Sequence, residues 1–183
     1  MIIWINGAFG AGKTTLSGKL RERLPDSLVL DPEEIGFLLR ATVPAPESGD
    51  FQDLPIWRRL TLTTLLELRR QYERPIIVPM TLVNPLYLEQ IQGGAVEAGE
   101  VLLNLYLDLD KEVLRTRIKQ QVLAPDPTRD EEIREWRLAQ VDRCLAARAL
   151  MPVGTYFVDS GALTPDELAD RVLAEIDKAH RSG

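Results

Sequence analysis

Eight residues near the start of the chain have the types and the spacing of a phosphate-binding loop. They run from Gly7 to Thr14 and fit the pattern G-x-x-x-x-G-K-[ST]. The glycines let the backbone curl so that successive N–H groups face phosphate oxygens, with the positive end of the next helix behind them. The segment predicts an ATP site whose residues are Gly7, Ala8, Phe9, Gly10, Ala11, Gly12, Lys13, Thr14 and Thr15.

Two side chains of this loop indicate phosphoryl transfer. Lys13 is expected to neutralise the β- and γ-phosphates and to act in catalysis, and the Thr14 hydroxyl is expected to bind the Mg²⁺ that bridges them. The flanking sequence agrees, because residues 1–5 are typical of a buried strand and leucines recur every four residues up to Leu24. The alternative is a plain strand-to-helix turn, which requires three glycines and a Lys-Thr pair to match by chance.

The composition is that of a globular domain with one core. The 183 residues are 45% hydrophobic and 27% charged, and the net charge of −6 argues against a nucleic-acid surface. A single cysteine, Cys144, allows no internal disulfide and is expected in the core. Since no leader or membrane-spanning stretch is evident, we expect a cytoplasmic protein with no transmembrane segment.

Strands and helices alternate along the rest of the chain. The predicted strands after the first are the apolar runs at residues 28–30, 76–78, 101–107 and 155–158. The predicted helices after the first cover residues 31–40, 55–73, 110–121 and 131–150, and others begin at 84 and 164. This alternation predicts an α/β fold, a parallel sheet covered on both faces with ligands at the carboxyl ends of its strands. We predict one domain, residues 1–183.

Carboxylates that follow strands are candidates for acid–base and metal chemistry. Asp31 could accept the proton of an attacking hydroxyl or contact Mg²⁺ through water, but Asp-Pro-Glu-Glu is also typical of a helix start. Asp108 and Asp110 resemble a second acidic motif, yet their strand comes late and Asp110 suits a helix cap. The third strand leads into residues 79–81 with no carboxylate. We therefore expect a metal site with few acidic ligands.

Basic side chains gather around a proline-containing loop at residues 123–130. Phosphoryl transfer needs mobile positive charge near the γ-phosphate, so we predict that the segment from about 117 to 143 closes as a lid. On the helix from Glu131, one stripe carries Trp136, Gln140 and Arg143. A solvated face of mixed charge is the alternative, and we favour it for most of these arginines other than Arg117 and Arg143.

Several further blocks resemble the tunicamycin-resistance protein family of bacterial P-loop proteins. More distantly, the chain is similar to chloramphenicol phosphotransferase, shikimate kinase and gluconate kinase. The matching blocks are residues 2–14, 31–33, 36–37, 39–40, 50–52, 55, 57–58, 78–81 and 140–144. The resemblance implies a three-layer P-loop fold like that of nucleoside-monophosphate kinases, with a five-stranded parallel sheet in the order 2-3-1-4-5.

The resemblance also implies roles for residues outside the loop. Asp31 matches the strand-end carboxylate that acts as a base in related kinases, Arg117 matches the arginine that packs on adenine, and Arg143 follows the lid and is expected to be catalytic. The expected acceptor-binding residues are Arg40, Phe51, Trp57, Arg58, Met80, Thr81 and Gln140. Three of these, Phe51, Trp57 and Met80, suit the hydrophobic core equally well.

The chain departs from the pattern at Gln121, where many related kinases have a second lid arginine. The charge of the transition state is therefore expected to be met by Arg129, Arg137 or Arg143.

These features predict an ATP-dependent phosphotransferase with an alcohol-group acceptor. It would confer tunicamycin resistance by moving the γ-phosphoryl group of ATP to a hydroxyl of tunicamycin or of a similar nucleoside-like or nucleotide-sugar-like compound. One alternative is a housekeeping kinase of a small metabolite. The other is a non-catalytic protein that sequesters tunicamycin in an ATP-dependent way, which the small set of acids favours and Asp31 and the arginines oppose. The acceptor and the oligomeric state are left open.

Overall fold

The computed structural model describes residues 1–182 and contains one parallel sheet. Its strands are β1 (Ile2–Gly7), β2 (Leu28–Val29), β3 (Ile76–Pro79), β4 (Leu102–Asp108) and β5 (Tyr156–Asp159). The order β2-β3-β1-β4-β5 confirms the predicted sheet. Strand β1 is central, and all of its residues are buried because neighbouring strands and helices enclose it. The phosphate-binding loop therefore starts from a buried strand that is paired on both sides.

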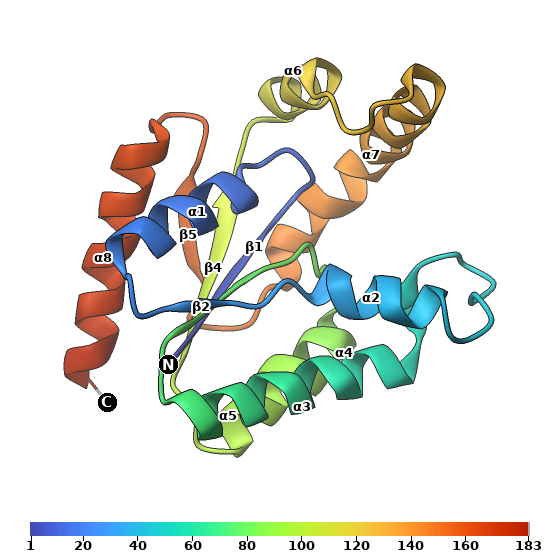
Figure 1. The fold of residues 1–183 in the computed structure, drawn as a ribbon. Coiled ribbons are helices and arrows are strands. Elements are labelled where there is room, and N and C mark those ends of the chain that lie inside the picture. Colours follow the sequence, from blue (N-terminus) through green and yellow to red (C-terminus); the bar gives the residue numbers. More distant parts are fainter. Residues whose placement is uncertain (183) are drawn as a thin grey trace.

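Helices cover both faces of the sheet (Figure 1). On one face lie α1 (Lys13–Arg23) and α8 (Pro165–Ser182), and on the other lie α3 (Pro55–Tyr72), α4 (Pro85–Leu88) and α5 (Gly94–Glu97), with a π-helical turn, η2 (Glu89–Gly93), between the last two. Alternate residues of β1 enter the two cores: Ile3 and Ile5 pack with α1 and α8, whereas Trp4 packs with α3. Among residues 1–182, no helix has both the length and the apolar character needed to cross a membrane.

The remaining long helices stand beyond or beside the carboxyl ends of the strands (Figure 1). They are α2 (Pro32–Arg40), α6 (Lys111–Gln120) and α7 (Pro127–Ala147). Two short 3₁₀ turns, η1 (Phe51–Asp53) and η3 (Arg148–Leu150), precede α3 and follow α7. Helices α6 and α7 share a cluster with the loop residue Ala8, so the segment predicted as a lid packs against the phosphate-binding loop.

The predicted start of the helix at Glu131 is wrong, because α7 begins four residues earlier at Pro127. The Asp126 carboxylate caps the helix by accepting the Arg129 N–H at 2.8 Å, and proline fits the first helical position. Asp130 then faces the preceding loop, where its carboxylate accepts N–H groups of Leu123 and Ala124. The expected long loop is therefore shorter and tied to α7.

Candidate active site

The phosphate-binding loop requires glycine for two separate reasons at Gly10. Its φ of 84° lies in the left-handed region, which residues with a side chain rarely adopt. A Cβ atom there would also lie 3.0 Å from Cγ1 of Ile118 in α6. The loop is thus curled and close to α6, and this places the first turn of α1 behind it with unpaired N–H groups facing the site.

Lys13 is held against the loop by backbone carbonyl groups. Its Nζ donates to the oxygens of Gly7 and Ala8, at 3.0 and 2.9 Å. Burial of the amine lowers the pKa of Lys13 to about 8, because the charged form loses hydration there. Thr81, expected in the acceptor site, instead donates its hydroxyl to the Gly7 oxygen at 2.9 Å and supports the loop from the segment after β3.

A first cavity of about 480 Å³ extends from this loop. Gly10 to Thr15 line it, as does Arg117 on α6 together with Ser160, Leu163 and Pro165 from the segment between β5 and α8. The Arg117 guanidinium donates to the Ser160 carbonyl at 3.0 Å. The planar guanidinium of Arg117 thus lies beside the apolar residues Leu163 and Pro165, at the end of the cavity away from α2. Such surroundings suit a purine base.

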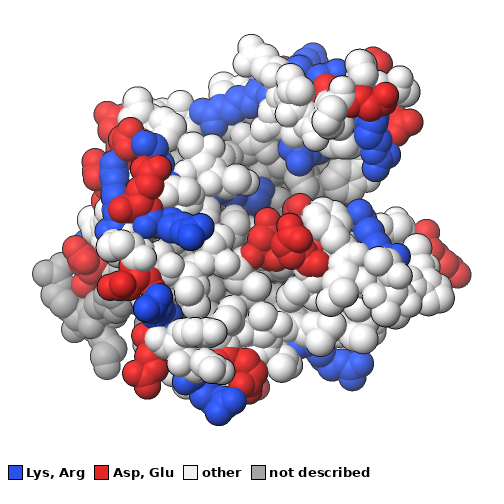
Figure 2. All heavy atoms as spheres, viewed as in Figure 1, with Lys and Arg blue, Asp and Glu red and all other residues white. Residues whose placement is uncertain are grey.

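A second cavity of about 550 Å³ lies between α2, the segment before α3, and α7. Figure 2 shows a hollow in this part of the surface, with acidic atoms at its inner end and basic atoms on both sides. The lining residues come from four separate segments of the chain: Phe9, Glu33, Phe37, Arg40, Ser48, Gly49, Asp50, Phe51, Gln52, Arg129, Glu132, Ile133, Trp136 and Arg137. Among residues 1–182, only Phe9, Glu33 and Arg137 line both cavities, so these side chains mark the junction.

Glu33 is a candidate that the sequence analysis missed. Asp31 ends the extended segment and caps α2 by accepting the Glu33 N–H at 2.9 Å, and it lines the first cavity alone. Glu33, one position into the helix, is half-buried at the junction. Burial, followed by the charge of Asp31, raises the pKa of the Glu33 carboxyl. The sequence did contain a signal, namely an acid two residues after Asp31. We interpreted that acid only as part of the helix start.

Arg137 is the arginine that the fold brings to the junction. Its Nη1 donates to Oε1 of Gln121 at 2.9 Å, and its guanidinium lies 5.5 Å from the centre of the Phe9 ring. Burial lowers its pKa. Arg129 lines only the second cavity, and Arg143, which was expected to be catalytic, lines neither cavity and is exposed. Gln121 therefore orients an arginine from the next helix.

The residues expected to bind the acceptor are divided between cavity and core. Arg40 and Phe51 line the second cavity. Trp57 and Met80 are fully buried in the core, and the Trp57 indole N–H donates to the Pro32 carbonyl at 2.9 Å, which fixes the start of α2. Trp57 thus holds α2 in place from behind.

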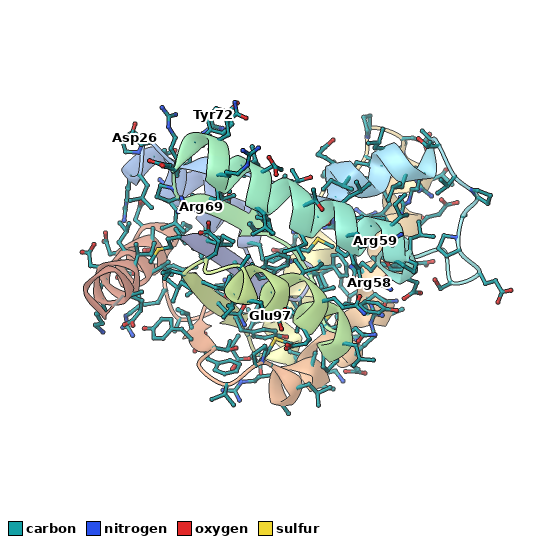
Figure 3. The ribbon with its side chains drawn as sticks, turned by 90° about the horizontal axis from the view of Figure 1, so that it is seen from below. Asp26, Arg58, Arg59, Arg69, Tyr72 and Glu97 are labelled. Carbon is teal, nitrogen blue, oxygen red and sulfur yellow. The ribbon has the colours of Figure 1, made fainter. Side chains whose placement is uncertain are left out.

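Arg58 and Gln140 also lie away from both cavities. The Arg58 guanidinium donates to Oε1 of Gln90 and lies 4.1 Å from the Tyr87 ring centre, on the side of α3 toward α4 (Figure 3). Arg58 therefore ties α3 to the segment from α4 to η2.

Asp108, the last residue of β4, and Asp110, two residues later, serve structural purposes. Asp110 caps α6 by accepting the N–H groups of Glu112 and Val113, which confirms the cap interpretation. Asp108 pairs with Arg148 at 2.6 Å. Among the described residues, no group of three or more His, Cys, Asp or Glu side chains is arranged to hold a metal ion. Side-chain oxygen atoms on the first cavity include the Thr14 hydroxyl and the carboxylates of Asp31 and Glu33.

The chain is similar to known proteins in both sequence and fold. The family model described as AAA domain matches residues 2–150. The chain is similar to the tunicamycin resistance protein of Deinococcus radiodurans, with 27% identity over 96% of this chain and 95% of that one and a TM-score of 0.69.

Two kinases share the fold at lower identity. A sugar kinase from Janibacter sp. HTCC2649 has 18% identity over 96% and 94% of the two chains and a TM-score of 0.66. A gluconokinase from Sinorhizobium meliloti 1021 has 17% identity over 97% and 91% and a TM-score of 0.63. No curated protein matches the sequence.

Proposed function

The chain belongs to the AAA domain family, and on that premise we propose that it is an ATP-dependent phosphotransferase with a hydroxyl acceptor. The observation that carries the proposal is the meeting of two cavities at Glu33, Arg137 and Phe9. A motor that hydrolyses ATP needs only the first cavity, whereas a kinase needs a second one for its acceptor. The family and the loop imply ATP binding in the first cavity.

In the proposed reaction, the acceptor oxygen forms a bond to the γ-phosphorus while the bond from that phosphorus to the β–γ bridging oxygen breaks, so ADP leaves. Glu33 takes the proton of the hydroxyl, because its carboxylate stands at the junction and its raised pKa brings it closer to working pH. Asp31 is committed to capping α2 and supports Glu33 from the first cavity.

Positive charge on both sides of the junction would meet the transferring group. Lys13 acts from the loop, where binding of phosphates would draw its amine from the carbonyl oxygens of Gly7 and Ala8. Arg137 acts from α7, held at its present position by Gln121. Such preorganised charge stabilises the transition state more than the ground state. We propose that the lid, about residues 117–143, carries Arg137 inward on closing and belongs to one domain that spans the chain.

The residues of the loop suit Mg²⁺. The Thr14 hydroxyl and the Asp31 carboxylate supply oxygen atoms, the donors that this ion prefers, and both line the first cavity. When bound, Mg²⁺ would neutralise the phosphate oxygens of the nucleotide. The small number of acids agrees with an ion held through one or two protein groups, water and phosphates.

For the acceptor we propose tunicamycin or a similar nucleoside-like or nucleotide-sugar-like compound. Two observations support it: the similarity to the tunicamycin resistance protein and the aromatic side chains of the second cavity, which suit a compound with a flat ring. A housekeeping metabolite kinase shares the same mechanism with another acceptor.

Mass spectrometry of tunicamycin incubated with the protein, ATP and Mg²⁺ tests the proposal. We expect a product heavier by one phosphoryl group at more than one turnover, and none with Lys13→Ala. Lys19→Ala is the matched control, because Lys19 lies on the same helix and pairs with Asp166 outside both cavities. Unchanged tunicamycin that nevertheless binds would indicate sequestration. Unchanged tunicamycin that does not bind would leave a metabolite kinase, to be sought with a panel of hydroxylated metabolites.

A further inference from the structure

The second cavity contains two charged side chains that the protein itself does not pair. Within residues 1–182, neither the Glu33 carboxylate nor the Arg40 guanidinium makes a hydrogen bond or ion pair. The other charges are engaged: Arg129 pairs with Glu132 at 2.9 Å and the Asp50 carboxylate accepts the Gln52 N–H. Glu33 lies at the junction and Arg40 at the far end of α2. The cavity thus has an acid at its inner end and a free cation at the other.

The Arg40 guanidinium is held in position without being neutralised. Its carbon Cζ lies 5.1 Å from the centre of the Phe51 ring and 5.8 Å from that of Phe37. A guanidinium that rests on aromatic faces keeps its N–H groups directed outward, in the planar arrangement that binds two oxygens of a carboxylate or phosphate. Arg40 therefore has the environment of a binding residue for an oxyanion.

Aromatic rings fill the space between these two charges. Phe9, Phe37, Phe51 and Trp136 all line the cavity, and Phe37 and Trp136 are 48% and 49% exposed. Trp136 is kept in place by an edge-to-face contact with Phe9, at 5.0 Å between ring centres. Large rings presented on a concave surface bind flat, apolar groups. A ligand with an unsaturated ring would cover them.

We propose that the acceptor carries three features in order: a hydroxyl that faces Glu33, a flat unsaturated ring that packs on the aromatic side chains, and an oxyanion that binds Arg40. Glu33 and Arg40 are seven residues apart on one helix, so their backbones are separated by about 10 Å along the axis. The inference rests on the proposed function, because it takes the second cavity as the acceptor site. It narrows the nucleoside-like and nucleotide-sugar-like acceptors proposed above to those that carry a carboxylate or a phosphate, which tunicamycin itself does not.

Two series of probes separate the ring from the anion, and a carboxylate from a phosphate. In each series one probe has both features and the others have one. The phosphate series is uridine 5′-phosphate, uridine and ribose 5-phosphate. The carboxylate series is 4-(hydroxymethyl)benzoate, benzyl alcohol and glycolate. Binding is measured by titration calorimetry with the nucleotide site saturated by Mg²⁺ and a non-hydrolysable ATP analogue, which keeps the probes out of the first cavity.

In at least one series, the probe with both features should bind about tenfold or more tightly than either partial probe. Arg40→Gln should remove about tenfold of that affinity and leave the ring-only probe within about twofold, whereas Arg40→Lys should retain most of the preference. Arg70→Gln is the matched control and should change affinity by less than about threefold, because Arg70 pairs with Glu67 on α3, outside both cavities.

Equal binding of complete and partial probes in both series, equal losses for ring-only and complete probes in Arg40→Gln, or no binding in either series would overturn the inference. Because calorimetry needs no turnover, the result is independent of the proposed reaction. Binding that depends on Arg40 without phosphoryl transfer would contradict the function and keep the inference. Phosphoryl transfer to an acceptor whose binding does not depend on Arg40 would support the function and contradict the inference.

Discussion

The two cavities differ in how the chain builds them. The first cavity includes one continuous segment, residues 9–16, and the backbone N–H groups of such a loop suit phosphate oxygens. The second cavity is assembled from side chains of Phe9, α2, the segment before α3, and α7. A site made from backbone leaves a fixed pattern in the sequence. A site made from side chains of distant segments can change its ligand without changing the fold.

We expect the largest effect from a substitution in the nucleotide cavity. Lys13→Ala removes the buried cation of the loop, and we expect phosphoryl transfer to fall by about 10³-fold or more. The measurement is the steady-state rate of ADP release in the presence of an acceptor, with Lys19→Ala as the unaffected control. A Lys13→Ala variant that keeps a tenth of the activity would contradict the proposed role of Lys13 in phosphoryl transfer.

The next effect distinguishes two neighbouring acids. Glu33→Gln should lower kcat by about 10²- to 10⁴-fold, the range for loss of a general base. Asp31→Asn should lower kcat less, because asparagine also caps helices and its side-chain oxygen can still contact Mg²⁺. Single-turnover rates measure both. If Asp31→Asn is the more damaging change, the base is the strand-end carboxylate that the family resemblance suggested.

The same Glu33→Gln variant should be at least as stable as the unchanged protein. A carboxyl whose pKa is raised in the folded state stabilises the fold when protonated, and that contribution is lost as the pH rises through the folded pKa. Above that pKa the ionised carboxylate therefore costs stability that glutamine does not. Thermal unfolding at pH 7 should give a Tm equal to or above that of the unchanged protein. A clear decrease would indicate that Glu33 is structural.

Arginines offer a comparison within one helix. Arg137→Gln should lower kcat by about 10²-fold, because it removes charge at the junction of the cavities, and Arg143→Gln should stay within about twofold. The readout is kcat with both substrates saturating. Equal losses in the two variants would show that lid closure brings Arg143 to the site as well.

The pH dependence is the smallest effect and concerns the nucleotide cavity alone. Above a pH of about 8 the free protein loses the charge of Lys13, so kcat/KM for ATP should fall about tenfold per pH unit. Bound phosphates favour the ammonium form, so the corresponding fall in kcat should lie at higher pH. Identical alkaline limbs in the two profiles would show that the phosphates do not meet Lys13.

The sequence predicted what depends on local pattern. The sheet follows from short apolar runs that alternate with helices, and the loop follows from glycine spacing. The start of α7 was missed because Asp126-Pro127 was read as part of a loop, although the same Asp-Pro pair had correctly marked the start of α2.

The junction could not be predicted in the same way. Whether Arg137 or Arg143 faces the loop depends on how α7 rotates against α6, which the packing of Ile118, Val141 and Cys144 decides. Asp31 and Glu33 lie two residues apart in the sequence, and the cap geometry is what distinguishes them. Trp57 illustrates the opposite error, since a residue suited to a ligand supports α2 from within the core.

Phosphoryl transfer from ATP to an organic acceptor can be tested without choosing the acceptor in advance. The protein is incubated with ATP labelled at the γ-phosphate, Mg²⁺ and a bacterial small-molecule extract, and the labelled products are separated by chromatography. Phosphotransfer predicts a labelled organic product in addition to inorganic phosphate, absent with Lys13→Ala and strongly reduced with Glu33→Gln. Label found only in ATP and inorganic phosphate, with the unchanged protein and across extracts, would contradict a kinase and indicate a nucleotide-dependent binding protein.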